Sequence, residues 1–197
     1  MSKALNNMSI ILASASPRRR ELLEMLGVKD MKIIPAHGEE HAPEGASPAE
    51  SVIAISGGKA TEAAEQCTPG DVIIAADTVV CLDGEILGKP HDTEDARHML
   101  RRLSGREHEV YTGVTIIADG RVLQGAECTK VRFRALKASE IDAYVATGEP
   151  MDKAGAYGAQ GIGSLFVEGI TGDFFNVMGL PLCRLGRMLN DVGVNLL

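Results

Sequence analysis

Aromatic residues are scarce in this sequence. It has no tryptophan, and its aromatic side chains are three Tyr and four Phe. Proteins that bind single-stranded nucleic acid stack the bases on such side chains. The formal net charge of −7 also gives no sign of the broad basic surface that non-specific nucleic-acid binding needs. We therefore expect no nucleic-acid partner.

Long apolar runs are missing as well. No stretch approaches the roughly 18 consecutive apolar residues of a membrane-spanning helix. The N-terminus shows no apolar segment typical of a secretory signal. We therefore expect a cytoplasmic protein with no membrane partner.

The sequence also lacks the usual cysteine and histidine patterns. The five histidines form no H-x-x-x-H or H-E-x-x-H arrangement, which disfavours a zinc site, and we expect His98 on a helix surface and His108 on a strand surface. No P-loop or G-x-S-x-G pattern is present. Four cysteines occur without a C-x-x-C pair, and we expect reduced thiols in buried or half-buried positions. They are Cys67, Cys81, Cys128 and Cys183.

What is present fits one globular domain, 1–197. Hydrophobic residues make up 45% and charged residues 24% of the chain, which is typical of a globular protein with a sizeable core. The stretch around which the rest is organised begins with a predicted strand, Ile10–Ala13. Two serines follow, and Pro17 suits the first position of a helix that Ser16 caps and Gly27 ends.

The start of this helix predicts an anion site. Free backbone N–H groups and the positive end of the helix dipole point to one place there. Arg18, Arg19 and Arg20 crowd the first turn, which is the unfavourable charge for a helix start. Either this is a solvated basic helix start, or the turn is built to receive an anion such as phosphate.

The remaining pattern predicts a mixed α/β domain with parallel strands early and antiparallel hairpins in the middle. Asp83-Gly84 and Asp119-Gly120 are the hairpin turns. The predicted strands are Met31–Ala36, Asp71–Ala76, Val79–Leu82, Glu85–Leu87, Glu107–Ala118, Arg121–Ala135 and Leu165–Ile170. The predicted helices are one from Ser47 to about Cys67 that begins with a Ser47–Glu50 capping box, Thr93–Leu103, a short helix to Thr147 that Ser139 caps, and Pro181 to about Val192. Gly148–Gly163 is predicted as an irregular loop and Phe174–Gly179 as an extended piece.

One oddity of the long second helix is Gly57-Gly58 in its middle. Each Gly costs roughly 1 kcal/mol relative to Ala there. We expect close packing or a bend at this pair.

Charged residues of both signs stand at the ends of the predicted elements. Carboxylates beside cations suggest a hard divalent ion that bridges to phosphate oxygens. Asp77 follows five apolar residues, so we expect it at the mouth of a strand, as a general base or metal ligand or else as a turn-initiating cap. The cations are Arg18, Arg19, Lys59, Lys89 and Lys153, and the carboxylates are Glu40, Asp77 and Asp152.

Several motifs, in order from about residue 10 to 186, resemble the signature of the Maf family of nucleotide pyrophosphatases. They are Ser14–Arg19 with Glu21–Leu23, Ala76–Val80, Gly88–Pro90, Leu103–Arg106 ahead of Val110–Val114, Asp152–Gly158 through Gln160-Gly161, and Gly172–Val177 with Gly179–Leu182.

The resemblance implies a fold and an activity. The fold is an elongated mixed α/β sheet flanked by helices, with two lobes around a cleft, similar to the inosine-triphosphate pyrophosphatases. The activity is hydrolysis of a nucleoside triphosphate between its α and β phosphates, with a divalent cation, Mg or Mn, and in a homodimer. A triphosphate needs cations and N–H donors around its oxygens, and a carboxylate can activate water or hold the metal.

The resemblance also assigns roles to residues. The phosphate-binding positions are Ser14, Arg18, Arg19, Lys59 and Lys89. The acidic positions, which hold the metal, are Glu40 and Asp77, and Asp77 matches the proton acceptor. Asp77, Glu40, Lys59 and Lys89 are the implied catalytic residues.

The segment around Gln160 resembles the dTTP/UTP branch of the family, in which Arg18, Thr78 and Gln160 match specificity positions. An amide offers both a donor and an acceptor to a pyrimidine edge. We therefore predict a house-cleaning pyrophosphatase for dTTP and UTP. The alternatives are an enzyme for 7-methyl-GTP or another modified nucleotide, and a nucleotide-binding regulator of septum formation with little turnover.

Overall fold

The computed structural model of the protein describes residues 9–197. In that range the strands are β1 (Ile10–Leu12), β2 (Lys32–Ile33), β3 (Val72–Leu82), β4 (Glu85–Leu87), β5 (Glu107–Ala118), β6 (Arg121–Phe133) and β7 (Val167–Thr171). The helices are α1 (Pro17–Met25), α2 (Pro48–Ala64), α3 (Thr93–Leu103), α4 (Ala138–Ala146), α5 (Phe174–Met178) and α6 (Leu182–Asp191). The 3₁₀ turns among the described residues are η2 (Glu149–Asp152), η3 (Ala154–Ala156) and η4 (Ile162–Phe166).

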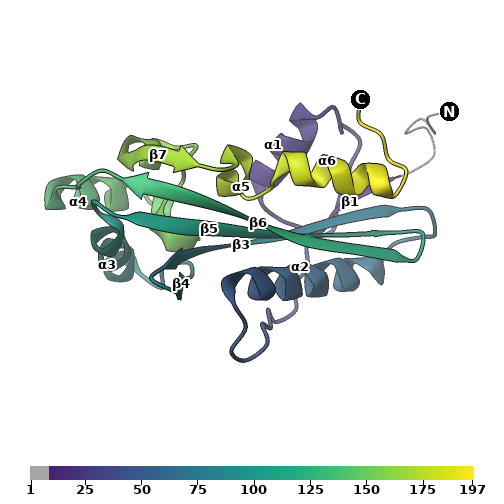
Figure 1. The fold of residues 1–197 in the computed structure, drawn as a ribbon, viewed down its shortest axis with the longest axis horizontal. Coiled ribbons are helices and arrows are strands. Elements are labelled where there is room, and N and C mark those ends of the chain that lie inside the picture. The colour runs from purple at the N-terminus through teal and green to yellow at the C-terminus, as the bar shows by residue number, and fades with distance from the viewer. Residues whose placement is uncertain (1–8) are drawn as a thin grey trace. The chain divides into compact units, whose positions relative to one another are not determined.

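These strands form a seven-stranded mixed sheet (Figure 1). Neighbouring strands follow the order β2-β1-β3-β5-β6-β7, and β4 pairs with β3. The strand β1 is parallel to β2 and β3, whereas β4 is antiparallel to β3 and β7 is antiparallel to β6. The predicted class, a mixed α/β sheet flanked by helices, is confirmed.

The chain divides into two compact units. Unit 1 holds the described residues up to Asp77 together with Thr112–Glu127 and Gly179–Leu197. Unit 2 holds Thr78–Tyr111 and Cys128–Met178. The strands β3, β5 and β6 contribute residues to both units.

In unit 1, α2 lies against one face of the sheet and α6 against the other (Figure 1). Small side chains let α2 approach closely, since Ala60 and Ala63 are buried against Ile11 and Ile73. The approach is closest at Gly113 of β5, where an added Cβ would collide with the α2 backbone around Val52. Glycine is therefore required at this position, and the helix is fixed against the strand.

For the glycine pair in the middle of α2, we expected close packing or a bend. An added Cβ at Gly57 would lie 2.6 Å from Gln124 Nε2, whereas Gly58 has open space around its α-carbon. The helix runs through both glycines. The expected close packing is thus found at Gly57, against the end of the exposed Gln124 side chain, and not at Gly58.

In unit 2, the core is a cluster of aromatic and aliphatic side chains from β5, β6, α3, α4 and the 3₁₀ turns. Phe133 packs edge-on against Tyr157 and Phe166, with ring centroids 4.7 and 6.0 Å apart. His108 was expected on a strand surface, but it is buried in this cluster with 2% of its surface exposed. The reason is register, because His108 shares the buried face of β5 with Val110 and Thr112.

Most predicted boundaries are close to the observed ones. The helix Thr93–Leu103 and the strand Glu107–Ala118 are confirmed as α3 and β5. Both predicted hairpin turns have a positive φ at the Asp and the Gly, which is the backbone of a type I′ turn. Ser47 and Glu50 form the predicted capping box of α2, although that helix ends at Ala64 and not near Cys67.

Three local predictions are wrong. The segment after Asp173 is helix α5, because the Asp173 carboxylate accepts hydrogen bonds from Phe175 N (2.8 Å) and Asn176 N (3.4 Å). Ser139 is inside α4, whose start is fixed by Glu140 accepting from Lys137 N at 2.8 Å. The Met31–Ala36 strand is confined to Lys32–Ile33.

None of the four cysteines forms a disulfide within residues 9–197, and the prediction of buried or half-buried positions holds for two of them. Cys81 is buried and Cys67 is half-buried. Cys128 and Cys183 are exposed, because they lie on solvent-facing positions of β6 and α6.

Within residues 9–197, no helix combines the length and the apolar character that crossing a bilayer requires. The prediction about a signal segment at the N-terminus falls on residues 1–8, which lie outside the described residues.

Candidate functional site

The loop between β1 and α1 holds Ser14 and Arg19 in one hydrogen-bonded arrangement. Ser14 Oγ accepts from Ser16 N at 3.2 Å and from Arg19 Nη1 at 3.0 Å. Arg19 Nε donates to Gly179 O at 2.8 Å. Ser16 occupies the N-cap position, but its hydroxyl does not cap the helix as predicted. The arginine is thus held from two sides, by the loop before α1 and by the chain before α6.

The second group in unit 1 is an ion triad centred on Lys59 of α2. Lys59 Nζ lies 2.7 Å from Asp77 Oδ1 and 2.8 Å from Glu40 Oε1. Side-chain exposure is 17% for Lys59, 11% for Asp77 and 55% for Glu40. Because Asp77 is buried, the lysine is its compensating charge.

Asp77 is not at a strand end as predicted. It lies inside β3, which continues to Leu82. Two causes extend the strand. Thr78, Val79 and Val80 are β-branched and favour a strand, and Val80–Leu82 pair with β4. The turn-initiating role for Asp77 is therefore wrong as well.

Arg19 shares an electrostatic environment with this triad. Burial lowers the pKa of the Arg19 guanidinium, the carboxylates of Asp77 and Glu40 oppose that shift, and the neighbouring Arg18 adds to it. Arg19 therefore lies near both carboxylates of the triad and near Arg18. Arginine side chains next to a lysine are the kind of group that attracts a multiply charged anion.

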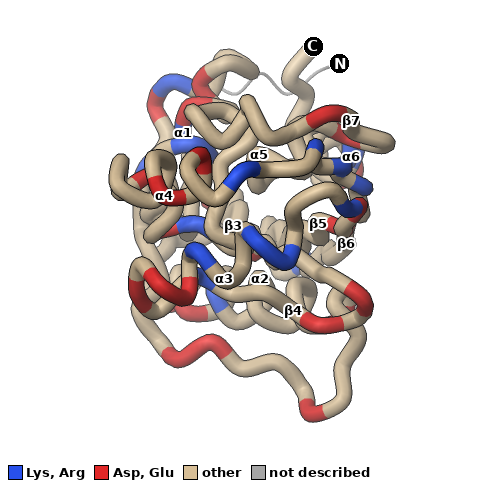
Figure 2. Tube along the Cα trace, turned by 90° about the vertical axis from the view of Figure 1, so that its left-hand side faces the viewer, with Lys and Arg blue, Asp and Glu red and all other residues tan. Residues whose placement is uncertain are grey.

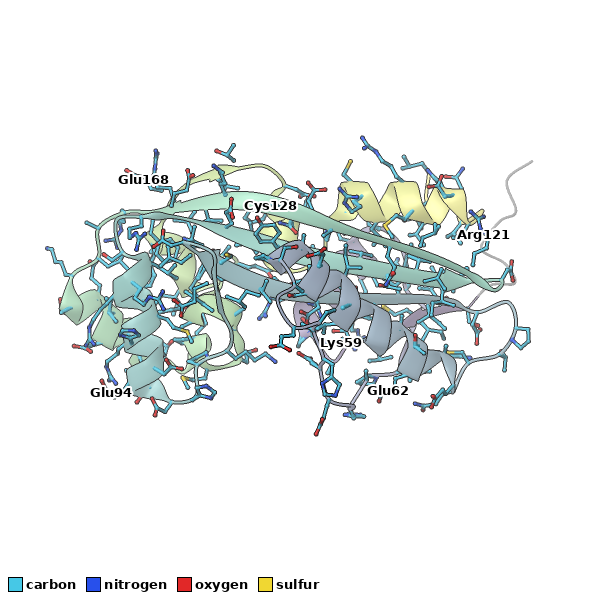
Figure 3. The ribbon with its side chains drawn as sticks, turned by 60° about the horizontal axis from the view of Figure 1, so that its bottom comes forward. Lys59, Glu62, Glu94, Arg121, Cys128 and Glu168 are labelled. Carbon is cyan, nitrogen blue, oxygen red and sulfur yellow. The ribbon has the colours of Figure 1, made fainter. Side chains whose placement is uncertain are left out.

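The loop that carries Glu40 is anchored by a residue that sequence reasoning missed. Glu62 lies one turn beyond Lys59 on α2, and its carboxylate accepts from His37 N at 2.7 Å and Gly38 N at 3.0 Å. These bonds lower the pKa of Glu62. The i, i+3 spacing of Lys59 and Glu62 on one helix was the available signal. Figure 2 shows the acidic segments of this loop, and Figure 3 shows both side chains on α2.

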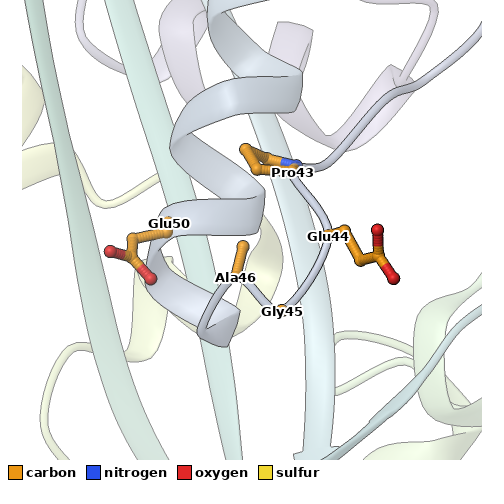
Figure 4. A pocket seen from close by; sticks show the side chains of 5 residues that line it. All are labelled: Pro43, Glu44, Gly45, Ala46 and Glu50. Carbon is orange, nitrogen blue, oxygen red and sulfur yellow. The ribbon is translucent and has the colours of Figure 1, made fainter.

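A hollow beside the same loop contains none of the predicted site residues (Figure 4). It is lined by Pro43, Glu44, Gly45, Ala46 and Glu50. It offers carboxylates and no cation, so it does not suit a phosphate.

The other predicted site residues belong to unit 2. Thr78 is half-buried on β3, and Lys89 is exposed two residues after β4. Gln160 is exposed between η3 and η4. Lys153 Nζ contacts Asp152 Oδ1 and Glu149 O, both at 2.6 Å. Lys153 and Asp152 therefore pair with each other in the loop that carries Gln160.

The donor set in unit 1 fits a divalent cation only in part. Within residues 9–197, no group of three or more His, Cys, Asp or Glu side chains is arranged to hold a metal ion. Glu40 and Asp77 supply two carboxylates that meet at one lysine. Mg²⁺ in nucleotide enzymes is commonly bound by one or two carboxylates plus substrate phosphates. The two residues fit that pattern.

Comparison with known proteins gives consistent matches. Residues 9–192 match the model of the family described as Maf-like protein. The chain is 48% identical over 185 residues to a dTTP/UTP pyrophosphatase of Bacillus velezensis, which covers 94% of this chain and 97% of the relative. It is 50% identical over 180 residues to a dTTP/UTP pyrophosphatase of Pyrococcus furiosus, which covers 91% and 93%.

Among solved structures, the chain is similar to a nucleoside-triphosphatase / dITP/XTP pyrophosphatase from Mycobacterium abscessus. The identity is 15%, the TM-score is 0.46, and the match covers 94% of this chain and 98% of that one.

Proposed function

Because the chain belongs to the Maf family, we propose that it hydrolyses nucleoside triphosphates to a nucleoside monophosphate and pyrophosphate. The two relatives described above are named dTTP/UTP pyrophosphatases, so dTTP and UTP are the proposed substrates. The observation that carries this proposal is the buried contact of Lys59 with Asp77, with Glu40 on the same ammonium group. A carboxylate held by a lysine, with Arg19 close to it, combines a proton acceptor with phosphate-binding charge.

In the proposed reaction, a water molecule attacks one phosphorus of the α–β anhydride. The bond from that phosphorus to the bridging oxygen breaks, and a proton of the water passes to Asp77. Lys59 fixes the Asp77 carboxylate and, with Arg18, Arg19 and Lys89, offsets the charge of the phosphates. Ser14 orients Arg19 through its hydroxyl.

We propose Glu40 and Asp77 as the residues that hold a divalent cation, Mg²⁺ or Mn²⁺. When bound, this cation supplies positive charge at the phosphate oxygens. Magnesium prefers hard oxygen ligands, and the carboxylates of Glu40 and Asp77 are ligands of this kind.

For base selection we propose Arg18, Thr78 and Gln160. The Gln160 amide can donate one hydrogen bond and accept another, as a pyrimidine edge requires. A site built to bond such an edge discriminates strongly, because the wrong base leaves its polar groups unpaired.

The same proposal includes a single domain over 1–197, a homodimer and a location in the cytoplasm, without nucleic-acid or membrane partners. The net charge of −7 supports the absence of a nucleic-acid partner.

The test is a product assay with dTTP, UTP, CTP, GTP and 7-methyl-GTP, each with Mg²⁺ or Mn²⁺ and with a chelator as control. Monophosphate and pyrophosphate from dTTP and UTP, lost on chelation, are the expected result. Preference for 7-methyl-GTP would keep the reaction and overturn the role of Gln160. Tight nucleotide binding without turnover would move the protein to the class of regulators.

A further inference from the structure

One carboxylate outside the family motifs organises the segment that carries Gln160. Glu149 stands at the start of η2, three residues before the Asp152–Gly158 motif. It is half-buried, and its side chain points into the segment Gly158–Gly163, hereafter the Gln160 segment. The proposed function assigns no role to it.

Glu149 bonds to the backbone after Gln160, and its partner Tyr144 bonds to the backbone before it. Ile162 N donates to Oε2 at 2.9 Å, and Gly163 N donates to Oε1 at 3.2 Å. The Tyr144 hydroxyl donates to the same Oε1 at 2.9 Å and accepts from Gly158 N at 3.2 Å. Tyr144 therefore holds the backbone two residues before Gln160, and Glu149 holds it two and three residues after.

Two glycines show how closely the segment wraps these side chains. An added Cβ at Gly161 would lie 2.6 Å from Glu149 Cδ. An added Cβ at Gly158 would lie 2.8 Å from Lys153 Cε, and Lys153 Nζ in turn donates to Glu149 O at 2.6 Å. A larger residue at Gly161 would require the Glu149 side chain to shift, and one at Gly158 would require the Lys153 side chain to shift.

Electrostatics agree with this arrangement. Burial by itself raises the pKa of Glu149, but hydrogen bonds from Ile162, Gly163 and Tyr144 outweigh it and bring the pKa below its ordinary value. The carboxylate is thus the favoured form, and it has acceptor sites for all three donors.

We propose that Glu149 is a positioning residue for base selection, because its carboxylate fixes the Gln160 segment. This inference rests on the proposed function, in which Gln160 contacts the base. A side chain that discriminates between bases must be held to a fraction of an ångström, and residues behind it supply that rigidity. Tyr144 acts with Glu149 as the second support.

The experiment compares Glu149→Ala, Glu149→Gln and Tyr144→Phe with wild type, with Glu168→Ala as matched control. Glu168 is an exposed carboxylate of the same unit, on β7, and pairs with Arg132 (Figure 3). Two quantities are measured for each protein. One is the ratio of kcat/KM for dTTP to kcat/KM for GTP, and the other is amide hydrogen exchange of residues 158–163 without nucleotide.

We expect Glu149→Ala to lower the dTTP/GTP ratio about tenfold or more and to speed exchange in the Gln160 segment, while α3 exchanges as in wild type. For both quantities, Glu149→Gln should lie between wild type and Glu149→Ala. The glutamine oxygen in the Oε1 position still accepts from Tyr144 and Gly163, but the glutamine NH₂ group then faces the Ile162 N–H and cannot accept from it. Tyr144→Phe keeps the ring contact with Phe166 at 5.0 Å and should show a smaller loss. Glu168→Ala should change neither quantity.

Faster exchange with an unchanged ratio in Glu149→Ala would overturn the inference and leave the proposed function intact. Unchanged exchange would overturn it as well. If Glu149→Ala does not fold, Tyr144→Phe decides by the same two criteria.

If wild type turns over no triphosphate, the proposed function fails, and the ratio of dissociation constants for dTTP and GTP replaces the kinetic ratio. Equal binding ratios in wild type and variant would then reject the role of Glu149.

Discussion

Lys59 Nζ lies 2.7 Å from Asp77 Oδ1, and this contact joins helix α2 to strand β3 across 18 positions of the chain. Asp77 is among the few buried charged residues of the described chain. Burying an acid inside a strand costs desolvation free energy, which a lysine from a packed helix offsets only in part.

Asp77→Asn should keep the fold and lower kcat/KM for dTTP by about 10²- to 10⁴-fold, because an amide cannot accept the proton from water. Thermal unfolding checks the fold, and pyrophosphate release measures the activity. Asp142→Asn is the control, since Asp142 is exposed on α4 and pairs with Arg97. Near-normal turnover in a folded Asp77→Asn protein would remove Asp77 from the proposed mechanism.

Lys59→Met should lower the free energy of unfolding by about 1–3 kcal/mol, since it leaves the buried Asp77 carboxylate without its cation. Urea titration measures this change. Lys130→Met is the control, because Lys130 forms an exposed pair with Glu107 at 3.3 Å, and such pairs contribute about 0–1 kcal/mol. Equal stability losses in the two variants would contradict the importance of the buried pair.

Glu62→Ala should lower kcat/KM about tenfold without a large loss of stability, because it releases the loop that presents Glu40 to Lys59. The amides of His37 and Gly38 lose their acceptor, so their hydrogen exchange should become faster. Glu65→Ala, at the exposed end of the same helix, should change neither readout. Slow exchange at His37 and Gly38 in Glu62→Ala would show that the loop is held by other contacts.

His108 makes stability depend on pH. Burial lowers its pKa from 6.5 to about 4, so between these values the unfolded chain binds a proton that the folded chain does not. The free energy of unfolding should therefore fall as pH drops from 6.5 to 4, by about 3 kcal/mol in total, and be fully restored above 6.5.

His108→Gln isolates this contribution from the carboxylates that titrate in the same range. Its unfolding free energy, measured by urea titration from pH 4 to 7, should vary less with pH than that of wild type. Parallel curves for the two proteins would exclude His108 as the source.

The sequence predicted turns and helix starts well where residues a few positions apart determine them. Asp83-Gly84 and Asp119-Gly120 define their turns by backbone preference, and Ser47 with Glu50 forms a capping box from side chains three residues apart. The helix after Asp173 could also have been found, because its capping carboxylate was visible in the sequence. It was missed because the apolar run after it also fits a strand.

The sequence indicated which residues form the site in unit 1, but not how they are arranged. The residue types around Lys59 and Asp77 indicated phosphate chemistry. The position of Asp77 inside β3 depends on pairing with β4, which is a tertiary contact. Glu62 and Glu149 act through bonds to distant backbone amides, and no short motif records such bonds.

The tight contact between Gly113 and α2 has a consequence for how variants of this protein should be judged. An alanine at Gly113 would displace the helix backbone at Val52 and Ile53, and the same helix carries Lys59 and Glu62. One methyl group on β5 would then misalign residues that it never touches. A variant could therefore retain every proposed site residue and still be inactive, so an intact residue inventory is not sufficient to infer activity in this chain.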